Sequence, residues 1–125
     1  MKIKSIIYFL IITFILIIIY FLSPLQEFFL ILIILGILFL ILGIILIFLA
    51  KKQKRKFFPI LIGISAIAPF VCAILHNLFY ALAITFENFK LLFEILHTSF
   101  FIIGLLIAPI TFIIGVIGYF LKNKS

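Results

Sequence analysis

Long apolar runs alternate with short polar breaks along the chain, and this pattern predicts four membrane-spanning helices. A bilayer core about 30 Å thick requires about 20 apolar residues in a helix. Runs of this kind are separated by a Ser-Pro pair, by a basic cluster and by a short charged segment. The predicted spans are residues 5–22, 28–50, 57–85 and 94–121, which make residues 1–125 a single all-α domain, an integral membrane bundle of four transmembrane helices.

The first apolar run also resembles the start of a secretory signal, because two lysines precede it. The apolar region of a signal is typically 7–15 residues long and ends in small residues. Residues 5–22 form a longer run, which ends at Leu22 and is followed by Ser23 and Pro24. We therefore expect the first span to remain part of the protein.

Basic residues are distributed unevenly among the predicted connections. With the N-terminus in the cytoplasm, the cytoplasmic segments hold nine Lys or Arg residues, whereas the opposite side holds one Lys and three Glu. Short cytoplasmic loops carry the excess of Lys and Arg in membrane proteins. We expect a multi-pass protein of the cell membrane with both termini in the cytoplasm. The basic cluster between the second and third spans consists of Lys51, Lys52, Lys54, Arg55 and Lys56.

Composition agrees with this topology. Hydrophobic residues make up 69% of the 125 residues and charged residues 10%, against roughly 45–50% and about 25% in soluble domains. The net charge of +7 would suggest nucleic acid in a soluble domain, but here the basic residues flank apolar runs, where they act on topology and lipids. The expected partners are the lipid bilayer, anionic headgroups at the basic cluster, and a second copy or another membrane protein; nucleic acid is not expected.

One face of the third span is polar or small. At 100° per residue, the polar and small side chains of this span fall within an arc of about 140°, and large aliphatic side chains fill the opposite side. Polar side chains in a membrane turn toward other helices. The candidate interior polar face consists of Ser65, Cys72, His76, Asn77 and Tyr80.

Small residues at helical spacing predict packing surfaces on the second and fourth spans, because they let a neighbouring backbone approach closely. Spans three and four also share the tripeptide Ile-Ala-Pro, which places Pro69 and Pro109 inside helices at similar depth. Interior prolines bend a helix, so paired kinks would leave room for a small cavity. The packing positions are Gly36, Gly43, Gly104, Ala108, Gly115 and Gly118.

His76 and Asn77 have two interpretations. One is a proton-linked or ligand-binding group in the bundle interior. The other, which we prefer, is a structural hydrogen bond to a carbonyl or a threonine of another helix. His97 lies near Glu87 and Glu94, and these are zinc-ligand types, but their spacing matches no metal motif. The two histidines are expected at different depths, so no haem, metal or other cofactor is predicted.

The connection between the third and fourth spans has an internal pattern of its own. Glu87, Lys90 and Glu94 are three and four residues apart and share one helical face. Two structures agree with this spacing: a short helix in the membrane interface, or an extension of the fourth span by a turn or two.

Missing residues narrow the function classes. No carboxylate lies inside a span, since Glu94 stands at the edge of the fourth, and this disfavours exporters driven through a membrane-embedded glutamate. The strong charge bias disfavours channels of dual topology. The single Cys72 excludes a disulfide or a thiol relay within the chain. We find no Ser-His-Asp set and no glycine-rich phosphate loop, so we expect no enzyme activity.

The sequence therefore favours a non-catalytic accessory or assembly component. The alternative is a small transporter or channel with its path between the third and fourth helices. A transport path requires Ser65, Cys72, His76 and Asn77 to line a space that water reaches. A structural bundle instead requires these side chains to be hydrogen-bonded and enclosed.

Overall fold

The computed structural model describes residues 2–24 and 29–123, and almost all of them are helical. Four helices are long and apolar enough to cross a membrane, which confirms the predicted all-α class with four such helices. Phe28, the predicted start of the second span, lies outside the described residues. In chain order the elements are α1 (Ile3–Leu22), α2 (Phe29–Ala50), α3 (Phe57–Thr85), the 3₁₀ turn η2 (Glu87–Phe89), α4 (Lys90–Ile102), the π-helical segment η3 (Ile103–Ile107) and α5 (Ala108–Asn123).

The fourth apolar helix is composite and longer than predicted. Residues from Glu87 to Lys122 form one 36-residue helical rod, so Glu94 lies inside α4 rather than at a helix start. Of the two structures expected for the charged connection, the chain thus has the extension of the fourth helix. The π-helical segment ends at Ile107, two residues before Pro109. A π-bulge is a recognised way for a helix to accommodate a disturbed hydrogen-bond ladder, and proline disturbs that ladder because it has no N–H.

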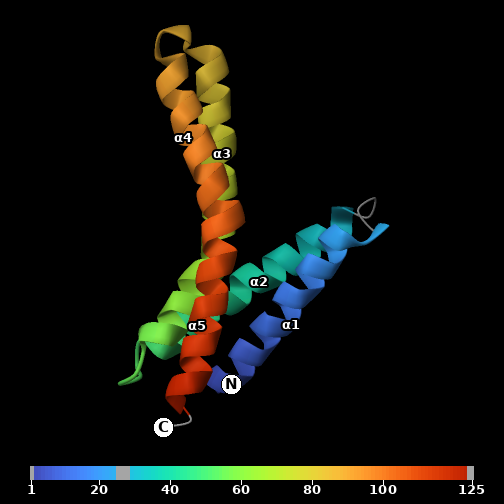
Figure 1. The fold of residues 1–125 in the computed structure, drawn as a ribbon, viewed down its shortest axis with the longest axis vertical. Helices are drawn as coiled ribbons and strands as arrows, with labels where there is room; N and C mark the ends of the chain where they lie inside the picture. Colours follow the sequence, from blue (N-terminus) through green and yellow to red (C-terminus); the bar gives the residue numbers. More distant parts are fainter. Residues whose placement is uncertain (1, 25–28, 124–125) are drawn as a thin grey trace.

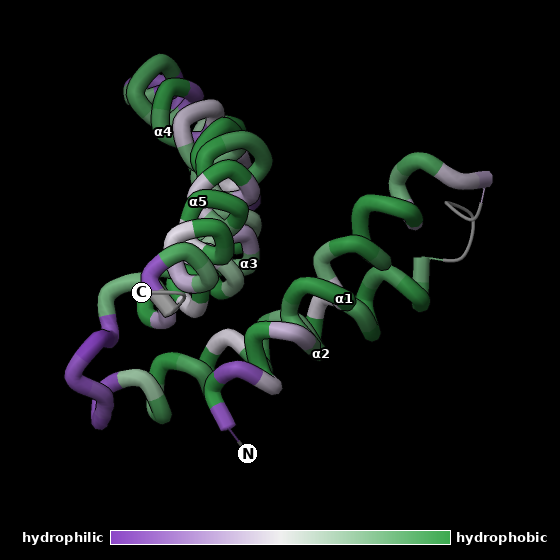
Figure 2. The backbone as a smooth tube through the Cα atoms, turned by 60° about the horizontal axis from the view of Figure 1, so that its bottom comes forward, coloured by the Kyte–Doolittle hydropathy of each residue, from purple (hydrophilic) through white to green (hydrophobic). Residues whose placement is uncertain are grey.

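The helices form two hairpins that pack together near one end and diverge toward the other (Figure 1). One hairpin consists of α1 and α2, and the second consists of α3 and the rod from η2 to α5. The marked chain ends and the connection between α2 and α3 lie at the packed end, which we call the basic end. Figure 2 shows the hydrophilic residues concentrated in that connection, whereas the helices are hydrophobic over most of their length. We call residues 86–89, at the far end of the second hairpin, the hairpin tip.

The core lies where the two hairpins meet. Phe112 of α5 stacks on Phe14 of α1, with ring centroids 4.7 Å apart, and its centroid is 5.3 Å from that of Phe39 in α2. By contrast α4, which the structure describes completely, contributes no buried residue. The buried cluster is Ile6, Ile7, Leu10, Phe39, Leu42, Leu46, Ile62, Ala66 and Phe112.

The four helices therefore form a bundle over only part of their length. The two hairpins diverge from each other along their length (Figure 1), and α3 is also longer than α1. At 1.5 Å per residue, the 20 residues of α1 span about 30 Å, whereas the 29 residues of α3 span about 44 Å. Beyond the core, α3 and α4 continue as a two-helix hairpin.

Glycines allow α3 to contact both neighbouring helices closely. A Cβ atom placed on Gly43 of α2 would lie 3.1 Å from the carbonyl oxygen of Gly63 in α3, and one on Gly63 would lie 2.9 Å from the carbonyl oxygen of Gly43. On the other side of α3, a Cβ atom on Gly115 would lie 2.8 Å from Cγ1 of Ile62. The central helix of the molecule is thus α3, which is also the helix with the polar face.

Candidate functional site

His76 of α3 and His97 of α4 face each other across the second hairpin. Nδ1 of His76 lies 2.9 Å from the carbonyl oxygen of His97, and Nδ1 of His97 lies 3.1 Å from the carbonyl oxygen of His76. A carbonyl oxygen only accepts, so each Nδ1 donates. The two rings stack with centroids 3.8 Å apart and an angle of 20° between their planes. We call this reciprocal arrangement the histidine pair.

The histidine pair corrects the expectation that the two histidines lie at different depths. That expectation started the fourth helix at Glu94, whereas the helical rod already begins at Glu87 beside the hairpin tip. His76 and His97 are almost equally far from the tip along the chain, and an antiparallel hairpin brings such positions to the same level. Equal distance from the tip is the sequence signal that could have found this pair.

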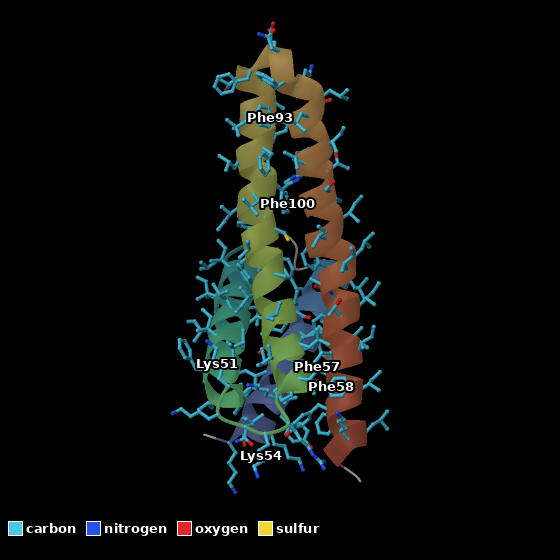
Figure 3. All side chains as sticks on the ribbon, turned by 90° about the vertical axis from the view of Figure 1, so that its left-hand side faces the viewer. Lys51, Lys54, Phe57, Phe58, Phe93 and Phe100 are labelled. Carbon is cyan, nitrogen blue, oxygen red and sulfur yellow. The ribbon has the colours of Figure 1, made fainter. Side chains whose placement is uncertain are left out.

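Aromatic rings surround the histidine pair along the hairpin. The ring of Tyr80 lies 5.3 Å from that of His97, and the ring of Phe101 lies 5.4 Å from that of His76. Phe79 of α3 stacks on Phe93 and Phe100 of α4, which lie before and after His97 along the helix, with centroids 6.1 and 5.6 Å apart. Figure 3 labels Phe93 and Phe100 along this hairpin. Side-chain rings thus hold α3 and α4 together where α1 and α2 no longer contribute.

The part of the predicted polar face nearest the core is enclosed. Ser65 is 3% exposed, and its hydroxyl donates to the carbonyl oxygen of Leu61 at 2.7 Å. Cys72 is 7% exposed. A Cβ atom placed on Gly104 of η3 would lie only 2.9 Å from the Cβ atom of Cys72. At this level α3 and the rod are in close contact, at the place where proline kinks were expected to leave a small cavity.

The outer part of the predicted face differs from expectation. Asn77 is exposed, and Tyr80 is 54% exposed although its ring contacts that of His97. At this level α3 packs against α4 alone, because the hairpin of α1 and α2 has diverged (Figure 1). A single neighbouring helix covers a narrower arc than two would. His76 falls within that arc and Asn77 falls outside it.

Hydroxyl groups along the helices bond to their own backbone. Thr13 donates to the carbonyl oxygen of Phe9 at 2.8 Å, and Thr111 donates to that of Ile107 at 2.7 Å. This bond to the carbonyl four residues earlier is the usual way for a helix to satisfy a hydroxyl group without a partner helix. Within residues 2–24 and 29–123, no buried side-chain nitrogen or oxygen atom lacks a hydrogen-bond partner.

The five glycines among the predicted packing residues all lie against α3. A Cβ atom on Gly36 would contact the ring of Phe70 at 2.9 Å, and one on Gly118 would overlap the ring of Phe58. Ala108 is 4% exposed. Gly63 is a further packing residue that the polar arc of the third span does not indicate, although its spacing of three from Ala66 is the same kind of signal.

The basic cluster forms the exposed connection between α2 and α3, so Lys51, Lys52, Lys54, Arg55 and Lys56 all reach solvent. Nζ of Lys51 lies 5.6 Å above the ring of Phe48 in α2. Far from this cluster, His97, Glu87 and Glu94 do not come together as a group of three possible ligands. The described part of the chain contains no group of three His, Cys, Asp or Glu side chains that could hold a metal ion.

Comparisons of this chain with protein-family models, with curated proteins and with solved structures find no match. The functional argument therefore depends on the geometry of the chain itself.

Proposed function

We propose that this chain is a small multi-pass protein of the cell membrane that acts as a non-catalytic accessory or assembly component. Four helices long and apolar enough to cross a bilayer support the membrane location. Large apolar side chains such as Ile74, Leu78 and Ile102 are exposed on the second hairpin. Water is a poor solvent for such a surface, whereas lipid tails and other transmembrane helices cover it readily.

The proposed orientation has both termini and the basic cluster in the cytoplasm. The two hairpins bring the chain ends and the basic cluster to the same end of the molecule (Figure 1). Glu87, Lys90 and Glu94 belong to the elements at the opposite end, beside the hairpin tip. The excess of Lys and Arg on one side supports a cytoplasmic basic end.

The observation that carries the accessory function is that Ser65 and Cys72, the inner part of the polar face, are buried and that His76 is bonded to α4. A path for a solute would require polar groups that exchange protein partners for water or solute. Ser65 is instead bonded to its own helix, Cys72 packs against Gly104, and His76 bonds to the backbone of α4. These partners favour a structural role over transport.

Cys72, the single cysteine of the chain, is a natural probe that separates these two functions. We expect its thiol in the reconstituted full-length protein not to react with a water-soluble maleimide, and to react after denaturation in SDS. The matched control is a C72A/N88C variant, whose cysteine at the hairpin tip should react without denaturation. Rapid labelling of Cys72 in the folded protein would overturn the accessory function and favour a water-filled path between α3 and α4.

A further inference from the structure

A cleft of about 520 Å³ opens at the basic end, between the start of α3 and the end of α5. Its cationic side is formed by Lys54, Arg55 and Lys56 from the basic cluster and by Lys122 from α5. Nζ of Lys122 lies 5.5 Å above the ring of Phe58, which links the two elements. Figure 3 shows Lys54, Phe57 and Phe58 together at this end of the molecule.

The start of α3 adds to the positive potential of the cleft. The first N–H groups of a helix have no partner within the helix, and Lys56 at the N-cap provides no side-chain hydrogen bond to them. The helix dipole also favours an anion at this position. Of the carboxylates in the described residues, Glu87 lies in the hairpin tip and Glu94 near it, at the opposite end of the molecule (Figure 1).

Apart from Tyr119 of α5, the rest of the cleft lining is apolar and follows α3 away from the basic cluster. Phe57 is 66% exposed and Ile64 is 53% exposed, and Leu61 lies between them on the lining. Ile64 is seven residues beyond Phe57, which places it about 10 Å further along the helix axis. A small soluble anion would use only the cationic side, whereas an amphiphile would use both parts.

We infer that this cleft binds one anionic phospholipid, and the inference rests on the proposed membrane location and orientation. The phosphate lies among Arg55, Lys56 and Lys122, since guanidinium and ammonium groups are the usual protein donors to phosphate oxygens. An acyl chain follows Leu61 and Ile64 toward the bilayer interior. The site thus ties the ends of α3 and α5 to the headgroup layer of the cytoplasmic leaflet.

Native mass spectrometry of the full-length protein in detergent tests this inference. Phosphatidylglycerol should form a one-to-one adduct at a concentration about tenfold lower than phosphatidylcholine with the same acyl chains. The variant R55Q/K122Q should weaken the phosphatidylglycerol adduct by about tenfold. The matched control K51Q/K52Q removes the same charge from the same end of the molecule, at positions that do not line the cleft, and should change binding less than about twofold.

The outcomes separate a defined site from general attraction. An equal loss in both double variants would show diffuse attraction to the basic end, and equal binding of phosphatidylcholine would show a site for acyl chains alone; either result overturns the inference. If glycerol phosphate saturates the cleft at the same concentration as phosphatidylglycerol, the ligand is a soluble phosphate and the inference of a lipid is overturned. Carbonate extraction of membranes tests the proposed function separately. Release of the chain would contradict the membrane location, whereas retention without lipid selectivity would contradict only the lipid site.

Discussion

His76 and His97 each donate a hydrogen bond from Nδ1 to the backbone carbonyl oxygen of the other, and their rings stack between those two bonds. Each side chain therefore satisfies a polar group inside an apolar hairpin while joining α3 to α4. The pair lies beyond the main core, where the hairpin of α1 and α2 has diverged (Figure 1). It takes the place of the aliphatic contacts that hold the helices together at the basic end.

The stacked rings predict that the effects of replacing the two histidines are coupled, because each hydrogen bond ends on a backbone carbonyl that the other replacement leaves in place. His76→Leu and His97→Leu should each lower the free energy of unfolding by about 1 kcal/mol, because interhelical hydrogen bonds in membranes average about 0.6 kcal/mol each. The double variant should lose less than the sum of the two. Equilibrium unfolding in mixed detergent micelles, analysed as a double-mutant cycle, measures this coupling.

Asn77→Leu is the control for the histidine cycle, because Asn77 is adjacent in sequence but exposed. Its effect on the free energy of unfolding should remain within about 0.5 kcal/mol. Strict additivity of the histidine variants, or a larger effect at Asn77, would show that the contact between α3 and α4 lies on a different face.

The contact between Gly43 and Gly63 predicts a strong stability effect at a position without any side chain. Gly63→Val should lower the stability by about 1–3 kcal/mol, because the added atoms would meet the carbonyl oxygen of Gly43 and the side chain of Ile47. Ile64→Val is the control, since Ile64 is adjacent and 53% exposed. Thermal unfolding in detergent should show a clear drop in Tm for the first variant and almost none for the second.

Much of the fold could be predicted from apolar run length alone. Four runs long enough for a bilayer gave four long apolar helices, and α3 occupies the residues 57–85 of the third run. The divergence of the hairpins could not be predicted in this way. Helices such as α2 are apolar on all sides, so their pattern does not indicate which side meets a neighbour or how far along its length the contact continues.

The candidate site was only partly accessible from sequence for a related reason. The polar arc of α3 marks one side of a helix, and the structure buries Ser65 and Cys72 on it but leaves His76 half-buried and Asn77 exposed. Which residues of such an arc are covered depends on the number of neighbouring helices at each level. That number is a property of tertiary packing and not of the α3 sequence.

The proposed orientation predicts one-sided labelling of introduced cysteines. In a C72A background, a cysteine at Asn88 should react with a membrane-impermeant maleimide added to intact cells, because the hairpin tip faces outward. A cysteine at Gln53, within the connection that holds the basic cluster, should react only after the membrane is permeabilised. Labelling of both positions from both sides would contradict a single orientation set by the basic residues.

The register of α3 against the helical rod predicts a specific cross-link. A Cβ atom at position 104 would lie 2.9 Å from that of Cys72, and a disulfide needs a Cβ separation of about 3.5–4.5 Å. A small outward shift would therefore let Gly104→Cys form a disulfide with Cys72 under mild oxidation. Formation of this disulfide is measured by maleimide labelling of the denatured protein: the label should be lost without reductant and restored by dithiothreitol.

Leu105→Cys is the control, because Leu105 is 55% exposed. Its cysteine should remain free or link two copies of the chain. An intramolecular cross-link at 105 instead of 104 would show that the rod is rotated by about 100° from its position in the structure.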